Sequence, residues 1–291
     1  GTGKPVQRSS TRLDWSPEKL NKQGFPHFML KEIHEQPVAL VDTLNLLLDR
    51  AKTDPFPLAQ QPGVEVISKA QKLTLVACGS SWHAALIGKY WIEHWAKIPV
   101  DVELASELRY REAVLGKGDA VIGISQSGET ADTLAVLREL KSRGIPTLGI
   151  TNVRGSSISR ETDGVFYMAA GPEIGVAATK TFLTQMTTLL LFAGHLARVR
   201  GVRSASEIEA LFDGLVKLPH LLTDLLGESG GLSAITQGIA KRLHDKGIRG
   251  YFFIGRGLSF PIALEGALKL KEIAYVHAEG YAAGELKHGP I

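Results

Sequence analysis

The sequence predicts an α/β fold, a three-layer sandwich in which helices cover both faces of a mainly parallel sheet. From residue 72 onward, short apolar runs typical of buried strands alternate with longer helical patterns, which favours parallel strands joined by crossover helices. Hydrophobic residues make up 44% of the 291 residues, enough to fill such a core. A turn rich in hydroxyl groups, residues 125–130, connects one expected strand to the helix after it.

The expected elements follow one another along the chain. Residues 15–18 begin a helix, with Ser16 as its cap and Pro17 in its first turn, and an amphipathic pattern over residues 28–52 predicts helices that lead into the main domain. The strands are expected at residues 73–78, 100–104, 120–124, 146–151 and 165–169. The helices are expected at residues 82–96, 129–142, 176–199, 204–226 and 232–246.

Composition and charge exclude several classes of protein. The net charge of +3 is small and spread along the chain, so a nucleic-acid partner is not indicated. The longest apolar run, residues 189–197, is interrupted by Gly194 and His195 and is too short to span a bilayer, and no secretory signal pattern is found. The single cysteine, Cys78, excludes an internal disulfide and a site of several metal-bound thiolates. We expect a cytoplasmic protein with no cofactor, no metal and no membrane partner.

The most informative motif is the turn of residues 125–130, Ser-Gln-Ser-Gly-Glu-Thr, which lies where an apolar strand ends and a helix begins. Backbone N–H groups in the first turn of a helix have no partner within it, and the helix dipole favours an anion there. Three hydroxyls, a carboxamide and free amides at one such place predict a phosphate site. The residues that supply these side chains are Ser125, Gln126, Ser127 and Thr130.

An ordinary capped helix is the alternative interpretation of this turn, because Ser and Thr are preferred at helix starts in any case. A single such residue would fit that alternative, but the density of hydroxyls favours the phosphate site. A phosphate monoester fits better than a nucleotide, because the turn has no lysine and the chain has no G-x-x-x-x-G-K-[ST] pattern. Residues 79–81 also lie at a strand's carboxyl end, where parallel sheets bind ligands.

Two stretches of the chain repeat the order strand, glycine turn, helix. Residues 251–257 mirror residues 73–81, and residues 283–288 mirror residues 105–110 at nearly the same spacing. Matched spacing over two motifs predicts a duplicated domain. We expect the chain to stop within the second copy, so that only its opening is present.

The helix expected at residues 262–276 is apolar almost all round, which predicts that it is largely buried. Glu265, Lys269 and Glu272 fall on one side of it and form a polar stripe. An exposed, salt-bridged stripe is the alternative, but buried charges on so apolar a helix are costly unless they are paired or used. A carboxylate in such a stripe is suited to moving a proton next to a carbonyl group.

Together, five segments resemble one known family, the isomerase portion of glutamine–fructose-6-phosphate aminotransferase, also called glucosamine-6-phosphate synthase. That portion contains two sugar-isomerase (SIS) domains, and the resemblance covers nearly the whole chain from about residue 15. The matching segments are residues 29–37, 78–81, 125–130, 173–180 and 263–290. The last segment is the most specific, because SIS domains in general share the serine turn but not Lys269, Glu272 and His288 together.

The resemblance implies binding roles for several matched positions. Ser81 is implied to join Ser125, Gln126, Ser127 and Thr130 in contacting the phosphate and the sugar. Val176 and Ala178 are implied to form part of the wall of the sugar pocket; without the resemblance they would be interpreted as plain core. The implied ligand is fructose 6-phosphate or glucosamine 6-phosphate.

The resemblance also implies catalytic roles. Glu272 is the implied base that moves a proton between C1 and C2 of the sugar, and Lys269 is its neighbour in the site. His288 is implied to open the fructose ring and to reach the site of a neighbouring subunit. By itself His288 would be a weak candidate, because lone histidines are usually structural or exposed.

These features divide the chain into parts, which are a linker at residues 1–28, leading helices at 29–63, the first SIS domain at 64–203, connecting helices at 204–246 and the incomplete start of the second SIS domain at 247–291. Full-length family members begin with a glutaminase domain that releases ammonia, and they use a lysine near the C-terminus to form an imine. The sequence contains neither the glutaminase domain nor the segment with that lysine, so we expect a fragment that binds sugar phosphate without turning it over. Apolar surface around Leu264, Leu268 and Ile273 is expected to be covered by a second copy, in a homodimer, or else to make the fragment prone to aggregation.

The implied function is ketose-to-aldose isomerisation in the synthesis of glucosamine 6-phosphate from fructose 6-phosphate and glutamine-derived ammonia. Two alternatives stay open. A non-catalytic sugar-phosphate-sensing SIS module would keep the serine turn but would not need Glu272 or His288. An ammonia-independent phosphosugar isomerase would convert the sugar without glutamine, so a test for amino sugar made from glutamine separates it from the first hypothesis.

Overall fold

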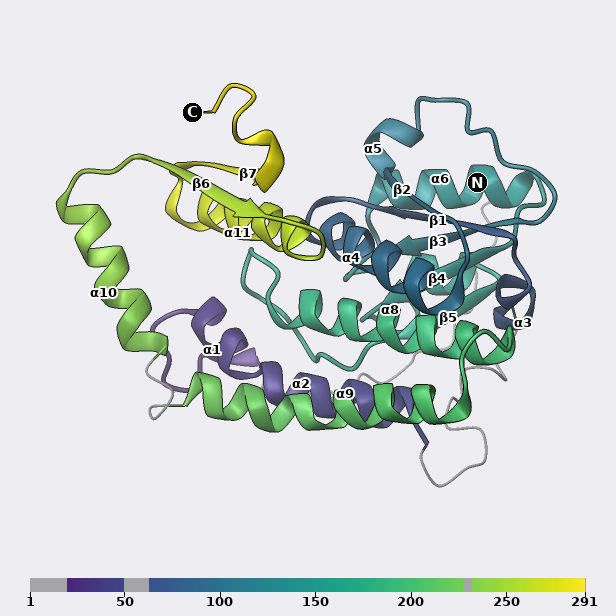
Figure 1. Cartoon of the computed structure of the whole chain (residues 1–291), viewed down its shortest axis with the longest axis horizontal. Helices are drawn as coiled ribbons and strands as arrows, with labels where there is room; N and C mark the ends of the chain where they lie inside the picture. Colours follow the sequence, from purple (N-terminus) through teal and green to yellow (C-terminus); the bar gives the residue numbers. More distant parts are fainter. Residues whose placement is uncertain (1–19, 50–62, 228–231, 291) are drawn as a thin grey trace, which may run out of the picture.

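The computed structural model describes residues 20–49, 63–227 and 232–290, and Figure 1 shows their arrangement. Its centre is a five-stranded sheet in the order β2-β1-β3-β4-β5, in which every neighbouring pair is parallel. The strands are β1 (Lys72–Ala77), β2 (Val100–Leu104), β3 (Asp119–Ile124), β4 (Thr147–Thr151) and β5 (Gly164–Tyr167). The parallel sheet predicted from the alternating pattern is thus confirmed. The helix start expected at residues 15–18 lies outside the described residues.

Helices cover both faces of this sheet. One face packs against α4 (Gly79–Ala96) and α8 (Lys180–Val199), and the other against α6 (Ala131–Ser142) with the short helices α5 (Ala105–Leu108) and α7 (Ser157–Glu161). Further out, α2 (Gln36–Leu47) and α9 (Ala205–Leu226) pack on α8. The remaining helices of the first part are α1 (Phe28–His34) and α3 (Val64–Ser68). The three layers of the sandwich are therefore present.

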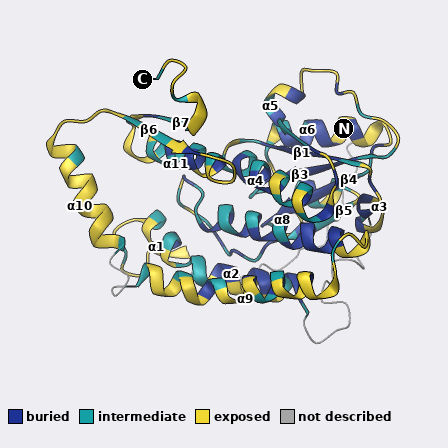
Figure 2. Cartoon of the chain, in the orientation of Figure 1, coloured by how far each residue is buried: buried dark blue, intermediate teal, exposed yellow. Residues whose placement is uncertain are grey.

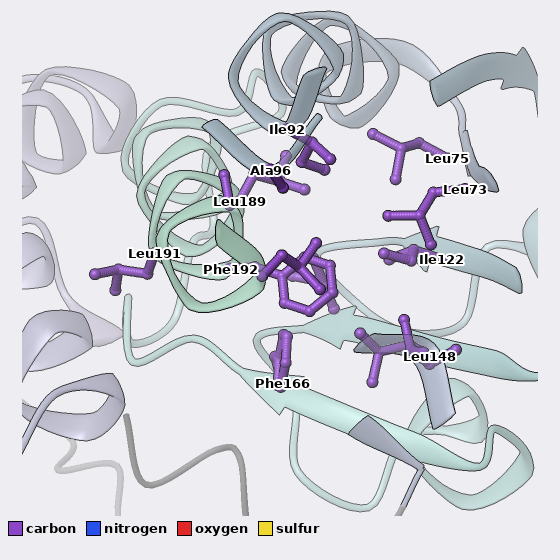
Figure 3. Packing of buried hydrophobic residues seen from close by; sticks show 14 of the residues in the cluster. Leu73, Leu75, Ile92, Ala96, Ile122, Leu148, Phe166, Leu189, Leu191 and Phe192 are labelled. Carbon is purple, nitrogen blue, oxygen red and sulfur yellow. The ribbon is translucent and has the colours of Figure 1, made fainter. Parts of the chain in front are cut away.

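The larger core lies between the sheet and the α4–α8 pair (Figure 3). Strand residues Leu73, Leu75, Ile122 and Leu148 face side chains of the two helices, and all four are fully buried. The rings of Phe166 and Phe192 meet edge to face, with centroids 5.3 Å apart. Each such buried side chain contributes roughly 1.5–3 kcal/mol of hydrophobic stabilisation. This packing fixes the strand ends from which the candidate site is built.

The second part of the chain repeats the opening of the first. Strands β6 (Gly250–Gly255) and β7 (His277–Ala282) are parallel and are joined by α11 (Ser259–Ala274), as β1 and β2 are joined by α4. The 3-10 helix η4 (Ala283–Glu285) follows β7, just as α5 follows β2. The two units share the element order that the repeated motifs predict. Helix α10 (Leu232–Asp245) precedes β6, has no buried residue and is exposed along its length (Figure 2).

Two expectations about helices are wrong. The helix expected from residue 176 begins only at Lys180, because carboxylates hold the preceding loop in a non-helical conformation: Glu173 accepts from the N–H groups of Thr179 and Thr181. Helix α11 is not largely buried, since Ile262 is 47% and Ile273 is 46% exposed. In α11 the buried residues are Pro261, Ala263, Glu265 and Ala267. The helix packs against β6, β7 and α4.

Apolar surface remains around the second unit. Phe252 and Ile254 on β6 are half exposed, and a hollow of about 790 Å³ opens between α10, β6 and α11. Leu270, Ala274 and Val276 are among its lining residues. The homodimer expected to cover apolar surface of this region stays a prediction.

Candidate functional site

The candidate site lies where the strand order of the large sheet reverses. The chain crosses from β1 to β2 on one side and then returns past β1 to β3, so β1 and β3 are neighbours with α4 and α6 leaving their carboxyl ends. In open parallel sheets such a switch point leaves a crevice that binds ligands. Residues 79–81 begin α4, and residues 125–130 form the turn between β3 and α6. The two motifs therefore belong to adjacent strand ends.

Hydroxyl groups shape the turn after β3. Ser125 is 2% exposed; its Oγ accepts from the Gly128 N–H at 3.0 Å and shares a hydrogen bond of 2.8 Å with Thr130 Oγ1. Ser127 Oγ accepts from the Glu129 N–H at 3.1 Å. The carbonyl oxygen of Gln126 accepts from the Asn152 N–H at 3.0 Å, which ties the turn to the end of β4. The turn is thus held in shape without a ligand.

The start of α6 keeps the capacity to bind an anion. The Thr130 side chain makes no capping hydrogen bond to the helix, so N–H groups of the first turn are left for an external acceptor. The nearby carboxylate of Glu129 is directed away, since it accepts from the Ser157 N–H at 2.7 Å. Hydrogen bonds from the backbone and side chain of Ser157 hold the pKa of Glu129 below its ordinary value. An anion in this turn would therefore meet hydroxyls and amides.

Ser81 is positioned by a glutamine of α8. Its Oγ accepts from Gln185 Nε2 at 2.9 Å. Because that amide occupies an acceptor position, the Ser81 hydroxyl hydrogen stays free to donate toward a ligand. Gln185 is 1% exposed, and its Oε1 is buried without a hydrogen-bond partner among the described residues. A buried glutamine is thus part of this site. The sequence feature that could have identified it is a polar side chain on the buried face of a largely apolar helix.

The polar stripe of α11 docks against the start of α4. Glu265 is 6% exposed, and its Oε1 accepts from Ser80 Oγ at 2.7 Å and lies 3.1 Å from Lys269 Nζ. Its Oε2 lies 2.7 Å from His83 Nδ1. Burial raises the pKa of Glu265, but the hydrogen bond from His83, the Lys269 charge and the Ser80 hydroxyl together bring the pKa below its ordinary value. Glu265 is therefore a carboxylate at neutral pH.

Lys269 connects this buried carboxylate to Glu272. Its Nζ lies 2.7 Å from Glu272 Oε2 and donates to Ser80 Oγ at 2.9 Å. The Glu272 side chain is 31% exposed, more than those of Glu265 and Lys269. The alternative of a stripe exposed to solvent is wrong, because α4 covers its first two residues. Glu265, Lys269 and Glu272 thus form a row of alternating charges, and Glu272 is its most exposed member.

The structure does not bring every predicted residue to this place. Val176 is 88% exposed and Ala178 is half-buried, so neither is plain core. Both lie in the loop before α8, where Glu32 Oε1 accepts from the N–H groups of Ile174 and Gly175 at 2.6 and 3.0 Å. Glu32 is 1% exposed and anchors the loop.

His288 is exposed, and within the described residues no hydrogen bond or ion pair joins its side chain to the stripe of α11. Its backbone N–H donates to the carbonyl oxygen of Glu285 at 2.9 Å. Among the described residues, His288 is therefore not paired with Lys269 or Glu272 by a hydrogen bond or an ion pair.

Sequence reasoning missed four residues of this arrangement: Glu32, Ser80, His83 and Gln185. Ser80 lay inside a motif that was recognised, but nothing in the sequence distinguished it from Ser81. His83 lies on an amphipathic helix where a histidine is ordinarily a surface residue. Its role depends on its partner Glu265 on α11, which lies 182 residues further along the chain.

The described residues contain neither a membrane-spanning helix nor a metal-binding cluster. No helix there is both long enough and apolar enough to cross a membrane. No group of three or more His, Cys, Asp or Glu side chains there is arranged to hold a metal ion.

The parallel sheet, its switch point and the repeated strand–helix–strand unit define a domain of the sugar-isomerase class. The SIS domain family matches residues 66–194 and 248–291, and the chain belongs to this family. Among curated proteins, it is 48% identical over 289 residues to the glutamine–fructose-6-phosphate aminotransferase [isomerizing] of Methanosarcina acetivorans. That alignment covers 99% of this chain but 46% of the relative, so the chain spans about half the length of the curated relatives it matches.

Solved structures agree with this assignment. The C-terminal domain of glucosamine-fructose-6-phosphate aminotransferase from Francisella tularensis superposes with a TM-score of 0.86 at 42% identity, covering 93% of this chain and 73% of that one. Glucosamine-6-phosphate deaminase from Thermotoga maritima superposes with a TM-score of 0.69 at 23% identity, covering 91% and 72%. The second likeness shows the shared fold alone.

We predict that Gly128→Ala disrupts the serine turn. Gly128 has φ +65°, and an added Cβ would collide with Ser156 Oγ and lie 2.7 Å from Thr151 Oγ1. Thermal unfolding should show a loss of stability greater than the roughly 1–2 kcal/mol that a left-handed conformation costs alone. Gly144→Ala is the matched control, since Gly144 has φ +79° with open space around it. Equal losses in the two variants would contradict the steric explanation.

The depressed pKa of Glu265 predicts how stability depends on pH. Such a carboxylate stabilises the fold above its unfolded pKa, ordinarily about 4.3, and loses that contribution as the pH falls through its lower folded pKa. At pH 7, Glu265→Gln should lower the free energy of unfolding by about 1.5–3 kcal/mol. Denaturation of both proteins from pH 7 to pH 3 should show this difference shrinking, with exposed Glu209→Gln as the control. A difference that grows with acid would contradict the assignment.

Proposed function

We propose that this chain binds fructose 6-phosphate and that, within the full-length protein, it carries the ketose-to-aldose isomerisation step of glucosamine 6-phosphate synthesis. The observation that carries the proposal is the docking of the α11 stripe beside the start of α4, at the strand end next to the serine turn. One motif suits a phosphate and the other offers a carboxylate paired with a lysine. A relative named for this reaction, 48% identical to this chain, supports it.

In this proposal the serine turn holds the phosphate. The hydroxyls of Ser125, Ser127 and Thr130, the carboxamide of Gln126 and the N–H groups that begin α6 supply neutral donors, and the helix dipole favours the dianion. The Ser81 hydroxyl donates to the sugar phosphate from the neighbouring strand end. These groups belong to the first SIS domain, for which we propose residues 64–203.

The chemistry in this proposal lies on α11. With the phosphate fixed, C1 and C2 of the open-chain sugar extend toward Glu272, whose carboxylate removes the proton from one carbon and returns it to the other. Lys269 stands 2.7 Å from Glu272 and supplies positive charge beside the developing enediolate oxygen. Loss of a general base typically costs about 10²–10⁴-fold in rate.

The remaining partners are proposals of the same kind. Ammonia would come from a glutaminase domain, which the relatives' name for a glutamine-dependent reaction supports. His288 would open the sugar ring in the site of a second copy of the chain, consistent with its exposure here. Val176 and Ala178, in the loop before α8, would border the sugar. A cytoplasmic location stays an expectation from the sequence.

A sugar-phosphate-sensing module is the second candidate function. One observation favours it: the serine turn is held by its own hydrogen bonds, independently of α11. A module that only binds would need the serine turn and neither Glu272 nor His288. The third hypothesis, an isomerase that uses no ammonia, would form aldose phosphate without glutamine.

We predict that Ser127→Ala weakens binding of fructose 6-phosphate about tenfold or more. A hydrogen bond to a charged group contributes roughly 1.5–3 kcal/mol, and each 1.4 kcal/mol corresponds to a factor of ten in affinity. Isothermal calorimetry of the chain measures this change directly, and Ser125→Ala should behave alike. Ser142→Ala, at the exposed far end of α6, is the matched control. Unchanged affinity in both turn variants would rule out the phosphate assignment.

We predict that Glu272→Gln in the intact protein slows isomerisation about 10²–10⁴-fold while affinity for the sugar phosphate stays similar. Glutamine keeps the shape of the side chain but cannot accept the proton. Following glucosamine 6-phosphate formation with and without glutamine separates the synthase from an ammonia-independent isomerase. Exposed Glu209→Gln on α9 serves as the control. Near-normal turnover in Glu272→Gln would show that another residue moves the proton.

A further inference from the structure

His83 is a buried histidine that the proposed chemistry does not use. It lies in the second turn of α4, and its side chain is 10% exposed while that of Glu265 is 8% exposed. The 2.7 Å separation of His83 Nδ1 and Glu265 Oε2 is a short hydrogen bond. A carboxylate can only accept, so the imidazole carries its proton on Nδ1. His83 therefore donates to Glu265 across the contact between α4 and α11.

The two oxygens of Glu265 have different partners. Oε1 accepts from Ser80 Oγ and lies against Lys269 Nζ, at 2.7 and 3.1 Å. For Oε2, His83 is the partner that the described part of the chain provides. A buried carboxylate oxygen without a donor is strongly disfavoured, so the carboxylate would rotate or take up a proton if His83 lost its N–H.

Lys269 is shared between two carboxylates. Its ammonium group lies 3.1 Å from Glu265 Oε1 and 2.7 Å from Glu272 Oε2. The negative charge on Glu265 therefore competes with Glu272 for the same cation. If Glu265 became neutral or turned away, Lys269 would pair with Glu272 alone. The undivided positive charge would then stabilise the Glu272 carboxylate more strongly and make Glu272 a weaker base.

From this geometry we infer that His83 is a positioning residue for proton transfer by Glu272: its Nδ1–H holds Glu265 so that Lys269 stays divided between the two carboxylates. The inference rests on the proposed isomerisation. It assigns a histidine of the first unit to the chemistry of the second. His83 acts through Glu265 and Lys269 and does not touch the sugar.

The test compares three variants of the intact protein with the wild type. His83→Leu removes the donor. His83→Asn keeps one, because the side-chain amide of asparagine places an N–H near the position of the histidine Nδ1. His94→Leu replaces an exposed histidine of the same helix and is the control. For each protein, kcat and KM for fructose 6-phosphate are measured together with the thermal unfolding midpoint, so that activity is expressed per folded enzyme.

We expect His83→Leu to lower kcat about tenfold or more, the effect of losing one hydrogen bond to a charged group. KM should stay within about twofold, because most of the proposed phosphate contacts belong to the serine turn before α6 and His83 takes no part in them. His83→Asn should recover most of the rate, and His94→Leu should match the wild type. This combination supports the inference, because a merely structural role would lower the unfolding midpoint without changing kcat per folded enzyme.

The contrary outcomes are distinct. If the wild type converts fructose 6-phosphate and His83→Leu retains its kcat, the inference fails and the proposed function stands. An equal loss of kcat in His83→Leu and His83→Asn also overturns the inference, because the hydrogen bond would then not be the cause. If the wild-type protein shows no conversion at all, the proposed function fails and the inference falls with it.

A second measurement needs no turnover. In the proton NMR spectrum of the chain, the Nδ1–H of His83 should appear far downfield, because it donates to a carboxylate, and His83→Leu identifies the signal by its loss. In Glu265→Gln the same proton should move upfield, since a neutral amide oxygen is a weaker acceptor. A His83 signal that is unchanged in Glu265→Gln would overturn the hydrogen bond on which the inference depends.

Discussion

The carboxylate of Glu265 lies between α4 and α11, where leaving water costs several kcal/mol unless every oxygen is paired. Ser80 and His83 on one helix and Lys269 on the other meet that requirement. The same contacts determine how the second unit sits against the first, since α11 meets α4 at the position where these bonds form. Lys269, which pairs with this buried charge, also lies 2.7 Å from Glu272.

The turn of residues 125–130, the proposed phosphate site, is held in shape by its own hydrogen bonds. Ser125 is buried and accepts a backbone N–H, while Gly128 passes close to Ser156 and Thr151 from the neighbouring strand end. Because these hydrogen bonds already order the turn, a phosphate that binds there would not have to order a loop.

The strand–helix–strand unit occurs twice, as β1–α4–β2 and as β6–α11–β7. Both units are parallel pairs joined by a helix, and the SIS domain family matches segments of each. In the first unit α4 is covered by α8, and in the second α11 is covered by α4 and its own strands. Helix α4 therefore serves both units: it packs against α8 in the first, and its first two turns bind the polar stripe of α11.

Much of this protein was determined by its sequence alone. Period-two and period-3.6 patterns are local, so the parallel strands, most helices, the serine turn and the polar stripe of α11 could be predicted from them. The tertiary structure alone decided what the charges pair with: His83 and Glu265 are 182 residues apart, and Glu32 reaches Gly175 from another helix. It also decided how the loop before α8 is anchored. Glu173 binds the backbone at the start of α8 from only six residues away, but Glu32 binds Ile174 from 142 residues away, and no local pattern contains that second contact.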